Sequence, residues 1–124
     1  MEHKVALVVD DEPSVRHYMS AVLRSDGFQT LEASGGTEGF RLVKAVHGRL
    51  DLIVSDIQMP DGDGISLASS VGMEYPAIPC LLVSAFPQAE ITMDVGFLQK
   101  PFLLAEFLRV VRKMTGQDRL ARAG

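Results

Sequence analysis

Four apolar segments of the sequence are each followed at once by a residue that could take part in chemistry. In chain order these residues are Asp10 with Asp11, then Asp56, Ser84 and Lys100. Short runs of aliphatic residues bounded by turn residues are typical of strands buried on both faces. Parallel strands end at one edge of their sheet, where binding sites form. We therefore expect three carboxylates, a hydroxyl and an ammonium group to meet at this edge.

Carboxylates brought this close repel one another, and without compensation at least one pKa rises. Mg²⁺ suits such a group because it prefers oxygen ligands, binds one or two carboxylates and commonly shares a phosphate oxygen. An aspartate there can act as a nucleophile towards a phosphoryl donor. The metal would hold one phosphoryl oxygen, Lys100 another, and Ser84 would donate to a third. The pattern thus suits phosphoryl transfer to an aspartate.

Asp56 is the central candidate, at the junction between an apolar run and a loop that contains Pro60 and several glycines. Taken alone, the stretch from Leu50 to Gly64 leaves two interpretations open. In the first interpretation the acid only caps the turn that follows, as Asp often does. Alternatively it belongs to a site, because burying an unpaired carboxylate is costly. The polar endings of the other strands favour the site.

Segments with helical periodicity separate the strand-like runs. The expected strands are residues 4–9, 28–33, 50–56, 80–83 and 95–98. The clearest amphipathic helix has its apolar stripe at Leu104, Phe107, Leu108, Val111 and Met114. Strands that alternate with helices, joined by right-handed crossovers, predict an α/β fold with a doubly wound parallel sheet and helices on both faces.

Length and composition predict one globular domain over residues 1–124. Of the 124 residues, 47% are hydrophobic and 23% are charged, which is ordinary for a soluble protein. Residues 117–124 are expected to form a frayed tail or the start of a linker. The net charge of −4, without a basic stripe, argues against nucleic acid as a direct partner.

The expected compartment is the cytoplasm. The single cysteine, Cys80, excludes an internal disulfide and fits a reducing environment. No apolar run reaches the roughly 18 residues that a membrane span needs. The segment Met1–Lys4 leads into a strand-like run without a signal-peptide pattern.

Four motifs in this order resemble the receiver domain of two-component response regulators, the CheY-like superfamily, over almost the whole chain. The motifs are Val8–Glu12, Asp56–Gly64, Ser84–Ala85 and Phe97–Phe102. Each is weakly specific alone, but together on successive strands they are specific. The resemblance implies a flavodoxin-like fold with five parallel strands in the order 2-1-3-4-5.

The resemblance also implies roles for the acidic residues. Asp56 would be the phosphoacceptor, and Mg²⁺ would be bound by Asp11, Asp56 and the backbone carbonyl of Gln58. Asp10 would act mainly through water and charge. The protein would be a signalling phosphoacceptor rather than an enzyme, although it would assist its own phosphorylation and autodephosphorylation. Its phosphoryl donor would be a histidine kinase or a histidine phosphotransfer protein.

Three further residues acquire roles through the same resemblance. Lys100 would pair with the phosphoryl group and precede a cis bond to Pro101. Ser84 would be the switch hydroxyl, and Phe97 the aromatic whose rotamer responds to phosphorylation. The chain would be a stand-alone protein or part of a larger response regulator or hybrid sensor kinase; the motif around Lys100 resembles receivers attached to hybrid kinases.

Two features depart from the family pattern. Only residues 88–94 remain for the fourth helix, and so short an isolated segment is marginal as a helix. We therefore expect the fourth helix to be shortened or absent, which puts in doubt the partner surface that receivers often build around it. Phe97 lacks the hydroxyl that a tyrosine would supply for hydrogen bonding.

Two alternative functions and several minor motifs complete the interpretation. A pseudo-receiver would bind partners without phosphorylation, but the chain retains the acids, the hydroxyl and the lysine. An aspartyl phosphatase usually carries a second acid two positions after its nucleophile, where this chain has Gln58.

The three histidines have no metal-ligand spacing. Asp61 and Asp63 are expected to shape a turn and cap the next helix, and Gly35–Gly36 to form a turn.

Overall fold

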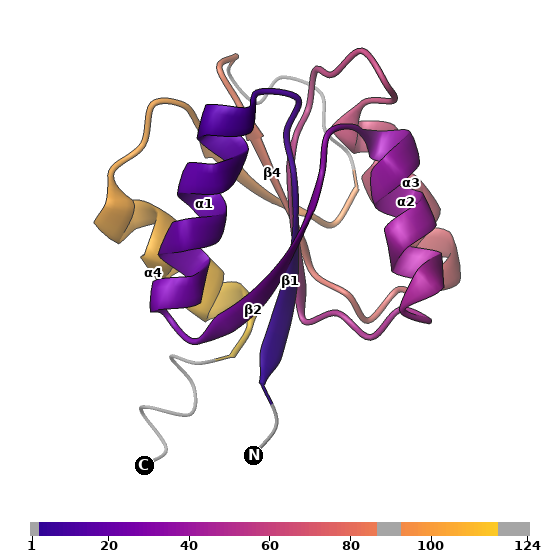
Figure 1. Ribbon diagram of the computed structural model, residues 1–124, viewed down its shortest axis with the longest axis horizontal. Helices are drawn as coiled ribbons and strands as arrows, with labels where there is room; N and C mark the ends of the chain where they lie inside the picture. Colours follow the sequence, from indigo (N-terminus) through magenta and orange to yellow (C-terminus); the bar gives the residue numbers. More distant parts are fainter. Residues whose placement is uncertain (1–2, 87–92, 117–124) are drawn as a thin grey trace.

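The computed structural model describes residues 3–86 and 93–116. Strands and helices alternate along these residues in the pattern expected from the sequence, except that no helix is described between the fourth and fifth strands (Figure 1). The elements are β1 (Lys4–Val9), α1 (Pro13–Ser25), β2 (Phe28–Ala33), α2 (Gly36–Ala45), β3 (Leu52–Asp56), α3 (Gly64–Glu74), β4 (Cys80–Ser84), β5 (Gly96–Gln99) and α4 (Leu104–Met114).

The five strands form one parallel sheet in the order β2-β1-β3-β4-β5, which confirms the predicted flavodoxin-like topology. The register brings the strand ends level. The last residue of β1 lies opposite Ser55, so that Asp10 follows beside Asp56. Ser84 ends β4 opposite the last residue of β5, immediately before Lys100. The sheet thus carries all five candidate positions to one edge.

Helices cover both faces of the sheet, with α1 and α4 on one side and α2 and α3 on the other (Figure 1). Alternate strand residues face opposite layers. Val8 packs in a cluster with Phe107 of α4, whereas Leu7 packs with Val43 of α2 and Leu67 of α3. Because the central strands are buried on both faces, their sequences are apolar throughout rather than alternating.

The helix boundaries follow local signals. Pro13 occupies the first turn of α1, where its missing N–H is no loss. Asp63 caps α3 by accepting a hydrogen bond from the Ser66 N–H, as the sequence predicts. The apolar stripe of α4 buries Phe107 and Val111. None of the described helices is long and apolar enough to cross a bilayer.

Two sequence expectations lie wholly or partly beyond the described residues. Between β4 and β5 the structure describes residues 85–86 and 93–95, and these contain no helix. The rest of the segment expected to hold a shortened fourth helix, residues 88–92, lies outside the described part of the chain. The tail expected at residues 117–124 also lies outside it.

Candidate functional site

Three carboxylates converge where β1 and β3 end. Asp10, Asp11 and Asp56 each offer an oxygen, and these oxygens lie within 4.8 Å of one another. Asp10 is fully buried, Asp11 is exposed, and Asp56 is intermediate. The carboxylate of Asp10 accepts a hydrogen bond from the backbone N–H of Glu12 at 2.9 Å. The group is therefore held by the strand ends rather than by flexible surface side chains.

Lys100 reaches back across the sheet edge into this acidic group. Its Nζ lies 3.2 Å from Oδ2 of Asp10 and 3.7 Å from Oδ1 of Asp56. The Lys100 N–H also donates to the Ser84 carbonyl at 2.7 Å, which fixes the start of the loop after β5. The peptide bond between Lys100 and Pro101 is cis, as the family resemblance implied. One ammonium group thus contacts two of the three carboxylates.

A hollow of about 340 Å³ opens beside these side chains. Its lining includes Asp11, Asp56, Gln58, Ser84 and Lys100. Ser84 is buried, and its Oγ accepts a hydrogen bond from the backbone N–H of Phe86 at 3.1 Å. The hollow is large enough for a small anionic group and is bordered by both negative and positive side chains.

Phe97 lies apart from this hollow. It is half-buried in β5 and packs against the core cluster on the α2 and α3 side of the sheet. The residues that line the hollow do not include it. The structure therefore brings together all the site residues expected from the sequence except the proposed switch aromatic.

Arg16 contributes to the site although the sequence pattern did not reveal it. Its Nη1 donates to the backbone carbonyl of Asp10 at 2.8 Å, and its Nε donates to Glu32 on β2 at 3.0 Å. Arg16 lies one turn into the helix that follows the acidic pair, which is the signal that could have identified it. It anchors the end of β1 from which Asp10 and Asp11 project.

The pKa of Asp56 is raised above its ordinary value of 3.8. Burial of the carboxylate is the main cause, and repulsion from Asp10 and Asp11 adds to it. The Lys100 ammonium and the Ile57 N–H lower the pKa but do not cancel the rise. Lys100 thus leaves the charge of Asp56 incompletely compensated. The oxygen donors of Asp10, Asp11 and Asp56 fit a hard divalent cation such as Mg²⁺.

This shift predicts the pH dependence of stability in the metal-free protein. A raised pKa means that the native state holds the Asp56 proton more tightly than the unfolded chain. The stability from this group is therefore fully present below pH 3.8 and is lost as pH rises through the raised native pKa. At neutral pH we expect Asp56→Asn to have a higher free energy of unfolding than the wild type.

Urea unfolding with chelator present tests this expectation. The stability difference between Asp56→Asn and the wild type should be largest near neutral pH and should shrink as pH falls towards 3.8. Other titrating groups are common to both proteins and largely cancel in the difference. A variant that is less stable than the wild type at neutral pH would show that the carboxylate is not destabilised by its surroundings.

A doubly wound parallel sheet with an acidic cluster and a lysine at its carboxyl edge is the arrangement that the resemblance to CheY-like receivers implied. The sequence matches the response regulator receiver domain family over residues 6–112. The chain therefore belongs to the response regulator receiver family.

Relatives in this family occur as parts of longer proteins. The sensor kinase CckA of Brucella abortus (strain 2308) is 32% identical over 114 residues, which cover 87% of this chain and 12% of that protein. The KDP operon transcriptional regulatory protein KdpE of Escherichia coli (strain K12) is 32% identical over 106 residues, covering 81% of this chain and 46% of that protein. The chain thus spans less than half the length of either relative.

The fold agrees with solved receiver structures. The receiver domain of the hybrid histidine kinase CckA superposes with a TM-score of 0.79 at 29% identity, and the match covers 90% of this chain and 98% of that one. A response regulator receiver domain protein from Clostridium thermocellum gives a TM-score of 0.83 at 22% identity, covering 95% and 98% of the two chains. The second comparison supports the fold alone.

Proposed function

We propose that this chain is a phosphoacceptor receiver in which Asp56 takes up the phosphoryl group. One observation carries the proposal: Asp56 lines an open hollow, with oxygens of Asp10 and Asp11 within 4.8 Å of its own and the Lys100 Nζ 3.7 Å away. A nucleophilic carboxylate needs access to its substrate and groups that balance the charge of the incoming phosphoryl oxygens. The surroundings of Asp56 meet both needs.

The proposed step is a simple displacement. An Asp56 carboxylate oxygen forms a bond to phosphorus, while the bond between phosphorus and the donor breaks and the donor leaves with the electron pair. Mg²⁺, bound through Asp11, Asp56 and the Gln58 carbonyl, with Asp10 acting through water, would supply neutralisation of phosphoryl charge. Lys100, already 3.7 Å from Asp56, would pair with a phosphoryl oxygen.

Ser84 and Phe97 are proposed to carry the response away from the site. The Ser84 hydroxyl borders the hollow. Its Oγ accepts from the Phe86 N–H, which leaves its own proton available to donate to a phosphoryl oxygen. Phe97 is half-buried in β5, the strand next to the one that ends at Ser84. A change of its rotamer would therefore repack the surface around β5. As a phenylalanine it would act through packing alone.

The proposed donor is a histidine kinase or a histidine phosphotransfer protein, and the proposed compartment is the cytoplasm. The resemblance to receivers of hybrid sensor kinases is supported by the similarity to CckA. Residues 1–124 are proposed to form one receiver domain, which stands alone or belongs to a longer chain. Its role is that of a signalling phosphoacceptor that assists its own phosphorylation, not that of an enzyme with a separate substrate.

Acetyl phosphate provides the test, because it is a small phosphoryl donor that needs no partner protein. With Mg²⁺ present, intact-mass spectrometry should show one added phosphoryl group per chain, and excess EDTA should prevent it. If the folded protein remained unlabelled with saturating Mg²⁺ and donor, the proposal would fail and a non-phosphorylated interaction module would replace it. Continuous release of phosphate from a phosphoester would instead indicate an aspartyl phosphatase.

A further inference from the structure

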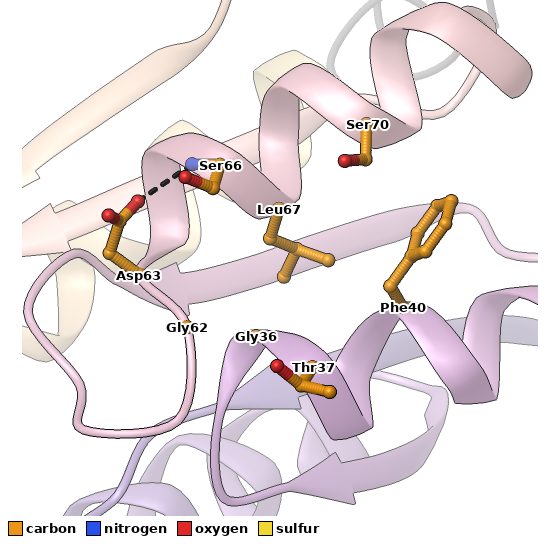
Figure 2. Close-up of a pocket in the computed structure, with 8 residues that line it drawn as sticks. All are labelled: Gly36, Thr37, Phe40, Gly62, Asp63, Ser66, Leu67 and Ser70. Atoms are coloured by element: carbon orange, nitrogen blue, oxygen red, sulfur yellow. Dashed lines mark hydrogen bonds between the residues drawn. The ribbon is translucent and has the colours of Figure 1, made fainter.

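The first turn of α2 is hydrogen-bonded to the β3–α3 loop (residues 57–63). The N–H of Gly36 donates to the Gly62 carbonyl at 2.9 Å, and the N–H of Thr37 donates to the Asp61 carbonyl at 3.0 Å. Figure 2 shows Gly36 and Thr37 at the start of α2 facing Gly62, with the start of α3 beside them. Two glycine-containing motifs that the sequence assigned only to turns therefore contact each other.

This contact depends on the absence of a side chain at Gly36. A Cβ built there would lie 2.7 Å from the Gly62 carbonyl oxygen and 3.0 Å from that of Asp63. The preceding Gly35 is equally close, with a Cβ position 2.6 Å from the Asp61 carbonyl oxygen. At Gly36 the obstructing atoms are all backbone atoms and cannot rotate away. Any larger residue at Gly36 must therefore move the loop and the start of α2 apart.

The same loop is tied to the site at its other end. The N–H of Ile57 donates to Oδ1 of Asp56 at 2.9 Å and its carbonyl accepts from the Gly64 N–H at 2.8 Å. Gln58, which follows Ile57, lines the hollow beside Asp56. Gln58 therefore lies in the loop between Ile57, which is bonded to the end of β3, and residues 61–62, which are bonded to the start of α2.

We propose that Gly36 is a positioning residue for magnesium binding. Through its close approach, the first N–H groups of α2 hold residues 61–62 of the β3–α3 loop, and this support keeps Gln58 beside Asp11 and Asp56 at the hollow. The inference rests on the proposed function, in which the Gln58 carbonyl is a ligand. Mutation of a group that orients a metal ligand, without binding the metal itself, typically lowers metal affinity by roughly 10- to 100-fold.

These N–H groups are not themselves an anion site. Those of Gly36 and Thr37 already donate to loop carbonyls, and the start of α3 is capped by Asp63 (Figure 2). The hydrogen bonds that a free helix start would offer to a ligand are here used to hold the loop.

Gly36→Ala tests the proposal, with Gly72→Ala as the matched control. A Cβ at Gly72, within α3, would meet nothing within 4 Å. By isothermal titration calorimetry, Gly36→Ala should raise the Kd for Mg²⁺ by about tenfold, and Gly72→Ala should leave it unchanged. With acetyl phosphate, Gly36→Ala should need more Mg²⁺ for half-maximal labelling but approach the wild-type rate at saturation. Equal Mg²⁺ affinity in folded Gly36→Ala and wild type would overturn the proposal.

A second measurement uses the wild type and does not depend on whether the variant folds. The amides of Gly36 and Thr37 exchange when their hydrogen bonds to the β3–α3 loop open. If this opening also removes the Gln58 ligand, Mg²⁺ binds only the closed form and stabilises it. Mg²⁺ at ten times its Kd should then slow exchange at these two amides by about tenfold. Equal exchange rates at these amides with and without Mg²⁺ would overturn the inference. Failure of the proposed function has a different signature, namely a wild type that binds Mg²⁺ but takes up no phosphoryl group.

Discussion

Protein carrying Asp56→Asn is expected to acquire no phosphoryl group from acetyl phosphate under conditions that label the wild type fully. Asparagine has nearly the same shape, so it preserves packing at the end of β3, but its neutral amide is not a nucleophile for phosphorus. Of the three clustered acids, Asp10 is fully buried and already contacts Lys100 at 3.2 Å. It is therefore not expected to substitute as acceptor.

Asp61→Asn provides the matched control for this result. It makes the same chemical change five positions further on, at an exposed side chain of the loop after β3. The backbone carbonyl of Asp61, which accepts from Thr37, remains in place. The control should therefore be labelled like the wild type. Labelling of Asp56→Asn to the wild-type extent would refute the assignment of Asp56.

Asp11→Ala is expected to weaken Mg²⁺ binding strongly without harming the fold. Asp11 is exposed, so its removal leaves no buried group unpaired, and it relieves repulsion within the acidic group. Two unit charges about 4 Å apart near a protein surface interact by roughly 4 kcal/mol. Because about 1.4 kcal/mol corresponds to a tenfold change in affinity, we expect at least a tenfold rise in Kd, measured by calorimetry.

Asp63→Ala should show the opposite behaviour. Asp63 caps α3 by accepting from the Ser66 N–H at 2.7 Å, and loss of such a cap typically costs about 1 kcal/mol of stability. Its carboxylate does not belong to the acidic cluster found among the described residues. Urea unfolding should therefore detect the change while Mg²⁺ affinity stays near the wild-type value. A larger loss of affinity in Asp63→Ala than in Asp11→Ala would contradict the assignment of the two acids.

Much of the fold was predictable because the sequence patterns of its strands differ clearly from those of its helices. The strands are apolar and short, and the stripe of α4 has an unmistakable helical period. The parallel arrangement then follows from their alternation. The gathering of Asp10, Asp56, Ser84 and Lys100 at one edge follows in turn, because a parallel sheet aligns the carboxyl ends of its strands.

Contacts between distant segments were not predictable in the same way. Arg16 reaches Glu32 only because α1 packs beside β2. The approach of Gly36 to Gly62 depends on the distance between α2 and the β3–α3 loop, which no local propensity encodes. The placement of Phe97 away from the hollow depends likewise on which face of β5 it occupies.

The most direct test of the account locates the phosphoryl group itself. An aspartyl phosphate is a mixed anhydride that borohydride reduces, which converts the modified aspartate to homoserine. After treatment of the Mg²⁺- and acetyl phosphate-labelled protein, tandem mass spectrometry should find homoserine at position 56. Homoserine at Asp10 or Asp11 with Asp56 unmodified would contradict the account.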